Sequence, residues 1–125
     1  MGLIHLPEYP NLRFDKEPLA FMESLKTEKD RRKVLKLIKN FDVYGYSQDI
    51  LGNHVEYVTV EPYRGLIELK EKISSKREVR FLIVKAPKGS PRHYLVLHAF
   101  IKRTQKLSKR DLDRALNVAK REDYL

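Results

Sequence analysis

The sequence predicts an α+β fold in which two N-terminal helices pack on a small antiparallel sheet and a C-terminal helix completes the chain. Three observations predict it. Apolar residues recur at helical spacing in the first third of the chain, β-rich apolar segments separated by turn residues follow from residue 65, and helical spacing returns after residue 108. One domain spanning residues 1–125 is expected, because compact domains commonly hold about 100–150 residues.

The first helix is expected to run from Glu17 to about Leu25. Pro18 suits a first helical turn, since its missing N–H would be unpaired there anyway, and Asp15 is available as the N-cap.

The second helix is expected over residues 27–44. Thr27 is its N-cap with Asp30 three residues on, as in a capping box, and Gly45 ends it. Its apolar stripe at helical spacing is Val34, Leu35, Ile38 and Phe41.

The pattern between residues 46 and 64 is weaker, with a turn at Gly52 and a short strand within residues 54–60. Three strands separated by turns are then expected at residues 66–73, 79–85 and 93–101. Ser108 is the expected N-cap of the last helix, with Asp111 three residues on. The buried stripe of that helix is Leu112, Ala115, Leu116 and Ala119.

The net charge of +9 is concentrated in one part of the chain. Residues 64–110 carry 14 basic and 3 acidic residues, a net charge of +11, whereas the flanking segments are each slightly acidic. A block of one sign favours a polyanionic partner such as RNA. Within the predicted strands the charges alternate with apolar residues, so one sheet face is expected in the core and the other toward that partner.

Several classes of protein and site are not expected. The chain has no cysteine, which excludes a disulfide scaffold and a cysteine-ligated metal. No apolar run approaches the roughly 18 residues of a membrane span, and the four histidines lack metal-ligand spacing. A cytoplasmic protein with no cofactor, no metal and no membrane partner is therefore predicted.

Three segments carry a resemblance to a known family. They read Gly65–Lys70 (GLIELK), Val79–Leu82 (VRFL) and Leu97–Lys106 (LHAFIKRTQK), and the chain ends in Arg121–Tyr124 (REDY). Together they resemble the HigB-like, phage-derived branch of the RelE/ParE superfamily of toxins from type II toxin–antitoxin systems. The third segment is the specific one, since it matches over ten positions.

The resemblance implies a fold similar to microbial ribonucleases, with helices on one face of a small sheet and a basic concave face. It also implies an mRNA interferase that cuts messages on the translating ribosome and is neutralised by a HigA-like helix-turn-helix antitoxin. Metal-free cleavage uses the adjacent 2′-hydroxyl as nucleophile and needs a base, an acid and cations. The residues expected in these catalytic roles are Arg80, Lys70, Lys102, Arg103, Glu68 and His98. Further cations expected to bind RNA are Arg64, Lys85, Lys106, Lys109 and Arg110.

The residue type indicates a single role for some of these expected catalytic residues and leaves two roles open for others. Arg80 matches the strand arginine of the family, and a guanidinium fork suits two phosphate oxygens. Lys70 either holds phosphate or acts as a base, and Glu68 either acts as a base or forms a structural ion pair. His98 is a candidate acid or base by its residue type, yet in an apolar strand a buried histidine held by a hydrogen bond is the commoner outcome.

Two alternative functions stay open on the same fold. A ParE-like toxin would poison DNA gyrase by binding it, and a non-catalytic module would only bind structured RNA. The filled basic positions on the predicted strands favour cleavage, because gyrase poisons tend to lack them.

Overall fold

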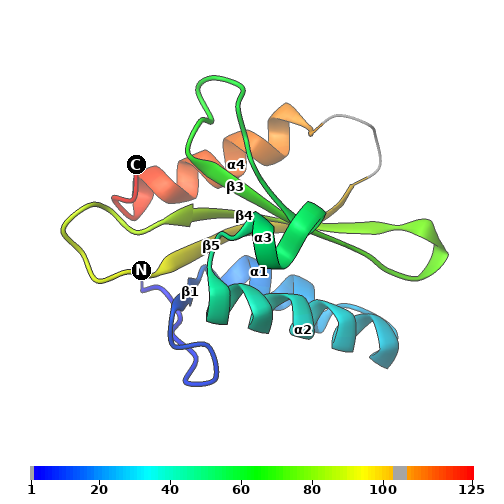
Figure 1. Ribbon diagram of the computed structural model, residues 1–125. Coiled ribbons are helices and arrows are strands. Elements are labelled where there is room, and N and C mark those ends of the chain that lie inside the picture. Colours follow the sequence, from blue (N-terminus) through cyan, green and yellow to red (C-terminus); the bar gives the residue numbers. More distant parts are fainter. Residues whose placement is uncertain (1, 103–106) are drawn as a thin grey trace.

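The computed structural model describes residues 2–102 and 107–125, and over these residues the chain folds around a five-stranded sheet (Figure 1). The strands are β1 (Leu12–Phe14), β2 (Val55–Tyr57), β3 (Leu66–Lys72), β4 (Glu78–Lys85) and β5 (Tyr94–Lys102). The helices are α1 (Lys16–Glu23), α2 (Glu28–Tyr44), α3 (Gln48–Leu51) and α4 (Lys109–Arg121), with 3₁₀ turns at Gly52–His54 and Ser74–Lys76. The predicted α+β class is confirmed.

The strand order is β1-β5-β4-β3-β2, so β3 to β5 form the expected antiparallel meander and β2 extends it in antiparallel pairing with β3. Strand β1 is not expected from the sequence; it pairs in parallel with β5 and makes the sheet mixed. Its Leu12 and Phe14 side chains are fully buried. Three residues are too short to show a period-2 pattern, which is why the strand has no clear sequence signal.

Helices cover both faces of the sheet. Phe41 of α2 packs with Phe81 of β4 in one core cluster, whereas Leu112 of α4 packs with Leu82 of β4 in the other. Because successive strand residues point to opposite faces, α1 and α2 lie on one side and α4 on the other (Figure 1). The family resemblance implied that all helices cover one face of the sheet. This expectation is wrong for α4, which covers the opposite face.

The predicted helix ends are confirmed where the cap residues act on the backbone. The Thr27 hydroxyl accepts a hydrogen bond from the Asp30 amide at 3.1 Å, and the Ser108 hydroxyl accepts two from the first turn of α4. Gly45 ends α2 with a φ of +66°, and a Cβ there would lie 3.0 Å from the Tyr94 hydroxyl. Both the conformation and the close approach therefore favour glycine at this position.

Two details of the helices differ from expectation. Asp15 is the N-cap residue of α1 but makes no capping hydrogen bond, and its carboxylate accepts from the Arg121 guanidinium of α4 at 2.7 Å. Leu35 is 43% exposed, and Leu37 takes its expected place in the core. Which side of α2 is buried depends on how the helix lies on the sheet. The spacing of apolar residues in the sequence does not determine that orientation. In the described part of the chain, no helix is long and apolar enough to cross a membrane.

A buried carboxylate ties α2 to the β3–β4 hairpin. Asp30 is 1% exposed and accepts hydrogen bonds from the Ser74 amide at 3.0 Å and the Ser74 hydroxyl at 2.8 Å. Arg77 lies 3.4 Å from its other oxygen. The Ser74 amide is the main reason that the pKa of Asp30 lies below its ordinary value of 3.8.

The Asp30→Asn variant is therefore expected to have a lower Tm than wild type at neutral pH. Because the folded-state pKa of Asp30 is lowered, its contribution is present above pH 3.8 and is lost as the pH falls through the lowered value. The difference in Tm between variant and wild type should accordingly shrink in acid. Thermal melts from pH 7 down to about pH 2 measure it, with exposed Asp49→Asn as the control. A constant difference across that range would contradict this role of Asp30.

Candidate functional site

Three neighbouring strands bring charged side chains to one corner of the sheet. Glu56 on β2 lies directly opposite Glu68 on β3, and Lys70 on β3 lies directly opposite Arg80 on β4. Directly opposed like charges destabilise a strand pair. A sheet that contains two such pairs side by side departs from the local rules of folding, and such departures gather at functional sites.

The attractive contacts in this array run diagonally between the strands. The Lys70 ammonium lies 3.0 Å from a Glu56 oxygen, and Arg80 Nη1 lies 2.6 Å from Glu68 Oε1. Arg80 Nε also donates to Glu78 Oε1 at 2.8 Å, and Nη2 contacts the same oxygen. Arg80 and Glu68 are 5% and 2% exposed, so this guanidinium is held rigidly inside the sheet corner.

One oxygen of Glu68 lacks a partner. Oε2 is buried and has no hydrogen bond to any residue that the structure describes. Burial raises the pKa of Glu68 above its ordinary value; Arg80 opposes the rise and Glu56 adds to it. The Lys70 ammonium, by contrast, is the main reason that the pKa of Glu56 is lowered. Two neighbouring carboxyl groups thus have pKa values shifted in opposite directions.

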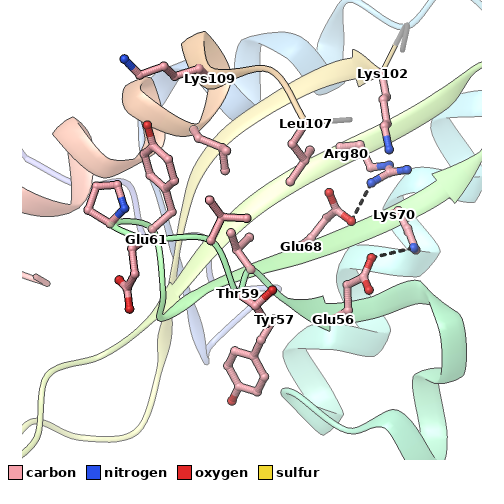
Figure 2. A pocket seen from close by; sticks show the side chains of 15 residues that line it. Glu56, Tyr57, Thr59, Glu61, Glu68, Lys70, Arg80, Lys102, Leu107 and Lys109 are labelled. Atoms are coloured by element: carbon pink, nitrogen blue, oxygen red, sulfur yellow. Dashed lines mark hydrogen bonds and ion pairs between the residues drawn. The ribbon is translucent and has the colours of Figure 1, made fainter. Parts of the chain in front are cut away.

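A cavity of about 820 Å³ opens over this array (Figure 2). That volume falls within the roughly 300–1,000 Å³ of ligand pockets in proteins. The charged side chains that line it are Glu56, Glu68, Lys70, Arg80 and Lys102 over the array, and Glu61 and Lys109 at the other end (Figure 2). Apolar side chains line the remainder, and they include Val58, Val60, Pro62, Leu107 and Leu112. Cations and proton-transfer groups therefore adjoin an apolar wall.

The wall opposite β3 is fixed to α4. Tyr63 is 4% exposed and its hydroxyl donates to Asp113 of α4. That hydrogen bond is the main reason that the pKa of Tyr63 is raised. The N-cap Ser108 positions the first turn of the same helix, from which Lys109 lines the cavity.

The structure brings together five of the residues singled out in the sequence. They are Glu68, Lys70, Arg80, Lys102 and Lys109. The faces expected for β3 and β4 are confirmed, since Glu68 and Lys70 point the same way and Arg80 shares their side of the sheet. In the described part of the chain, no carboxylate pairs with Lys102 or Lys109, so both are available to an anion. Arg103 and Lys106 lie outside the described residues.

His98 is not among the described residues that line the cavity. Its Nδ1 lies 2.9 Å from a Glu17 oxygen of α1, and its Nε2 lies 2.7 Å from an Asp111 oxygen of α4. The ring also stacks on Phe100, with the ring centroids 5.2 Å apart. This imidazole therefore bridges helices on the two faces of the sheet.

Three further cations also lie away from the cavity lining. Arg64 pairs with Glu61 at 2.7 Å on the exposed rim. Lys85 is the last residue of β4, and Arg110 is exposed in the first turn of α4. Through Glu61, the Arg64 pair includes a residue that lines the cavity.

The residue missed in the sequence is Glu56. It lies in the weakly patterned segment, and β2 is only three residues long. Its approach to Glu68 depends on the pairing of β2 with β3, which no local pattern specifies. The charge alternation at Glu56 was the one available signal, and it has meaning only once the strand register is known.

Electrostatically, the corner provides cations for an anion next to carboxyl groups able to accept and donate a proton. Within residues 2–102 and 107–125, no three His, Asp or Glu side chains are placed to hold a metal ion together.

Comparison with known proteins gives one match. The model of the family described as "Phage derived protein Gp49-like (DUF891)" matches residues 20–120, which include the sheet corner and most of α4. No curated protein and no solved structure matches the chain.

Proposed function

The chain belongs to the Gp49-like family of phage-derived proteins, and on that premise we propose that it is the toxin of a type II toxin–antitoxin system and an endoribonuclease. The family is toxin-like and falls within the context of the RelE/ParE superfamily. One observation carries the proposed activity: a buried Glu68–Arg80 pair forms the floor of a cavity that Lys70 and Lys102 also line.

The chemistry that suits this site is attack of an RNA 2′-hydroxyl on the adjacent phosphate. The attack builds negative charge on the phosphorane, which preorganised cations stabilise. Arg80 has five N–H donors; its contacts to Glu68 and Glu78 use three of them, which leaves two for phosphate oxygens. Lys102 and Lys109 add positive charges for the phosphates of the RNA backbone. The Glu68 carboxyl takes part in the proton transfer of the reaction.

The remaining wall of the cavity suits the rest of a nucleotide. Val60, Pro62 and Leu107 offer apolar surface beside the charged array, and a nucleobase splayed from single-stranded RNA packs on such surface. The reaction requires the 2′-hydroxyl, so we expect RNA and not DNA to be the substrate.

The proposed partners follow the family premise and the charge of the chain. We expect a HigA-like helix-turn-helix antitoxin to neutralise the toxin in the cytoplasm, and mRNA on the ribosome to be its substrate. Exposed cations on α2, among them Lys29 and Lys36, add basic surface outside the cavity. Ribosomal RNA presents phosphates to such a surface. We therefore expect mRNA on programmed ribosomes to be cut faster than naked RNA.

Expression of this chain is therefore expected to arrest growth and to shorten mRNA. Primer extension on transcripts isolated during the arrest should reveal new 5′ ends inside coding regions. Co-expression of a cognate helix-turn-helix antitoxin is the control and should restore both growth and transcript length. Intact transcripts during arrest, together with relaxed plasmid DNA, would contradict the nuclease and favour a gyrase poison.

A further inference from the structure

We propose that Glu56 is the general base of this cleavage and that it works with Glu68 as one acid–base pair. The inference rests on the proposed ribonuclease function. It adds a catalytic residue to the site, taken from a strand to which the sequence analysis assigned no chemistry.

Glu56 lies directly opposite Glu68 across the β2–β3 ladder, and both side chains reach the same cavity (Figure 2). The ladder places directly opposed residues about 4.5–5.5 Å apart at their Cβ atoms. Both carboxyl groups therefore lie side by side at the cavity wall, next to the Arg80 guanidinium.

The two carboxyl groups differ in exposure, in hydrogen-bond partners and in the direction of their pKa shifts. The Glu56 side chain is 54% exposed, and Lys70 holds one of its oxygens, so an incoming hydroxyl can approach it. Glu68 is buried, and its Oε2 has no hydrogen-bond partner in the described part of the chain. An unpaired buried carboxyl oxygen costs free energy unless it is protonated or meets a ligand. Opposite pKa shifts in a neighbouring pair support the assignment of base and acid.

No other described group in the cavity fits the role of base as well. Glu61 lies at the other end of the cavity, away from Glu68 and Arg80 (Figure 2). Lys70, Lys102 and Arg80 are cations, and His98 is held between helices outside the cavity lining.

In the proposed step, Glu56 takes the proton of the 2′-hydroxyl as the 2′-oxygen forms its bond to phosphorus. The bond between phosphorus and the 5′-oxygen breaks, and that oxygen takes the proton of the Glu68 carboxyl. The products are a 2′,3′-cyclic phosphate and a 5′-hydroxyl. Glu56 is left protonated and Glu68 ionised beside Arg80, and exchange with solvent water restores both groups.

The test compares Glu56→Gln with Glu68→Gln on two RNA substrates. The second substrate carries sulfur in place of the 5′-bridging oxygen at the scissile bond. A thiolate leaves without protonation, since a thiol has a pKa of about 8.5. Glu56→Gln should lose about 100-fold or more in rate on both substrates, because general base catalysis contributes roughly 10²–10⁴-fold. Glu68→Gln should lose as much on the natural substrate and recover most of it on the sulfur substrate.

The pH profile gives a second readout that an ion-pairing role would not move. The wild-type rate should rise with pH through the lowered pKa of Glu56 and fall through the raised pKa of Glu68. Glu56→Gln should remove the rising limb only. Glutamine still accepts a hydrogen bond from Lys70, so the fold should persist by circular dichroism and thermal melting.

Glu71→Gln is the matched control, since Glu71 lies on β3 next to Lys70 but faces the other side of the sheet. It should leave both rates unchanged. If wild type cleaves RNA and Glu56→Gln behaves like Glu71→Gln, the assignment of Glu56 is overturned. Recovery of Glu56→Gln on the sulfur substrate would also overturn it as the base. A folded wild type inactive on RNA would overturn the proposed function itself, and this inference with it.

Discussion

Arg80→Lys is expected to lower RNA cleavage about 100- to 1,000-fold and to leave the protein folded, because it removes one preorganised donor to a charged transition state. A lysine ammonium keeps the positive charge beside Glu68. It cannot also donate to Glu78 in a fixed plane and still direct two N–H groups at a phosphate. The rate should therefore fall far more than the stability.

Single-turnover cleavage and a thermal melt measure the two effects on the same preparation. Arg77→Lys is the matched control. Arg77 lies on the β3–β4 hairpin, pairs with Asp30 of α2 and does not line the cavity. Arg80→Ala is less informative, since it leaves the buried Glu68 carboxyl and the Glu78 carboxylate without the guanidinium that both contact, which also destabilises the fold. Wild-type cleavage by Arg80→Lys would remove the guanidinium from the mechanism.

His98→Leu is expected to destabilise the protein while the folded fraction keeps its cleavage rate. Leucine fills the space of the ring but leaves Glu17 and Asp111 without the imidazole that both contact. Leaving buried or half-buried polar groups unpaired costs about 1–3 kcal/mol. Urea unfolding gives the free energy, and cleavage below the transition gives the activity.

The control for this variant is His5→Leu, because His5 makes a single exposed contact to the Pro10 carbonyl. His5→Leu should change neither stability nor activity. If His98→Leu stays as stable as wild type but loses cleavage, His98 acts in the reaction and its bridging role is wrong.

The residues of the sheet corner differ in how far the sequence could place them. The sequence predicts that Lys70 and Glu68 share one face, because side chains alternate along a strand and alternation is a local property. It does not predict that Glu56 lies opposite Glu68, because this contact requires the pairing of two strands that a loop separates. Local patterns fix which way a side chain points, and only register fixes what it meets.

His98 shows the same limit from the other direction. The period of β5 suggests that His98 shares a face with Lys102, and both lie on β5 after an irregularity that leaves Leu97 without a partner on β4. What separates their environments is the approach of Glu17 and Asp111 from two helices, which are 81 and 13 residues away. Sequence patterns within a strand carry no information on such partners.

The most direct test of the central claim uses one RNA oligonucleotide on programmed ribosomes with the purified protein. The cut bond is mapped, and the same oligonucleotide is then made with a single 2′-deoxy sugar on the 5′ side of that bond. We predict cyclic phosphate and 5′-hydroxyl ends on the natural RNA and no cut at the substituted bond. Cleavage of the substituted bond at the natural rate would contradict 2′-hydroxyl attack and, with it, the chemistry assigned to the Glu68–Arg80 corner.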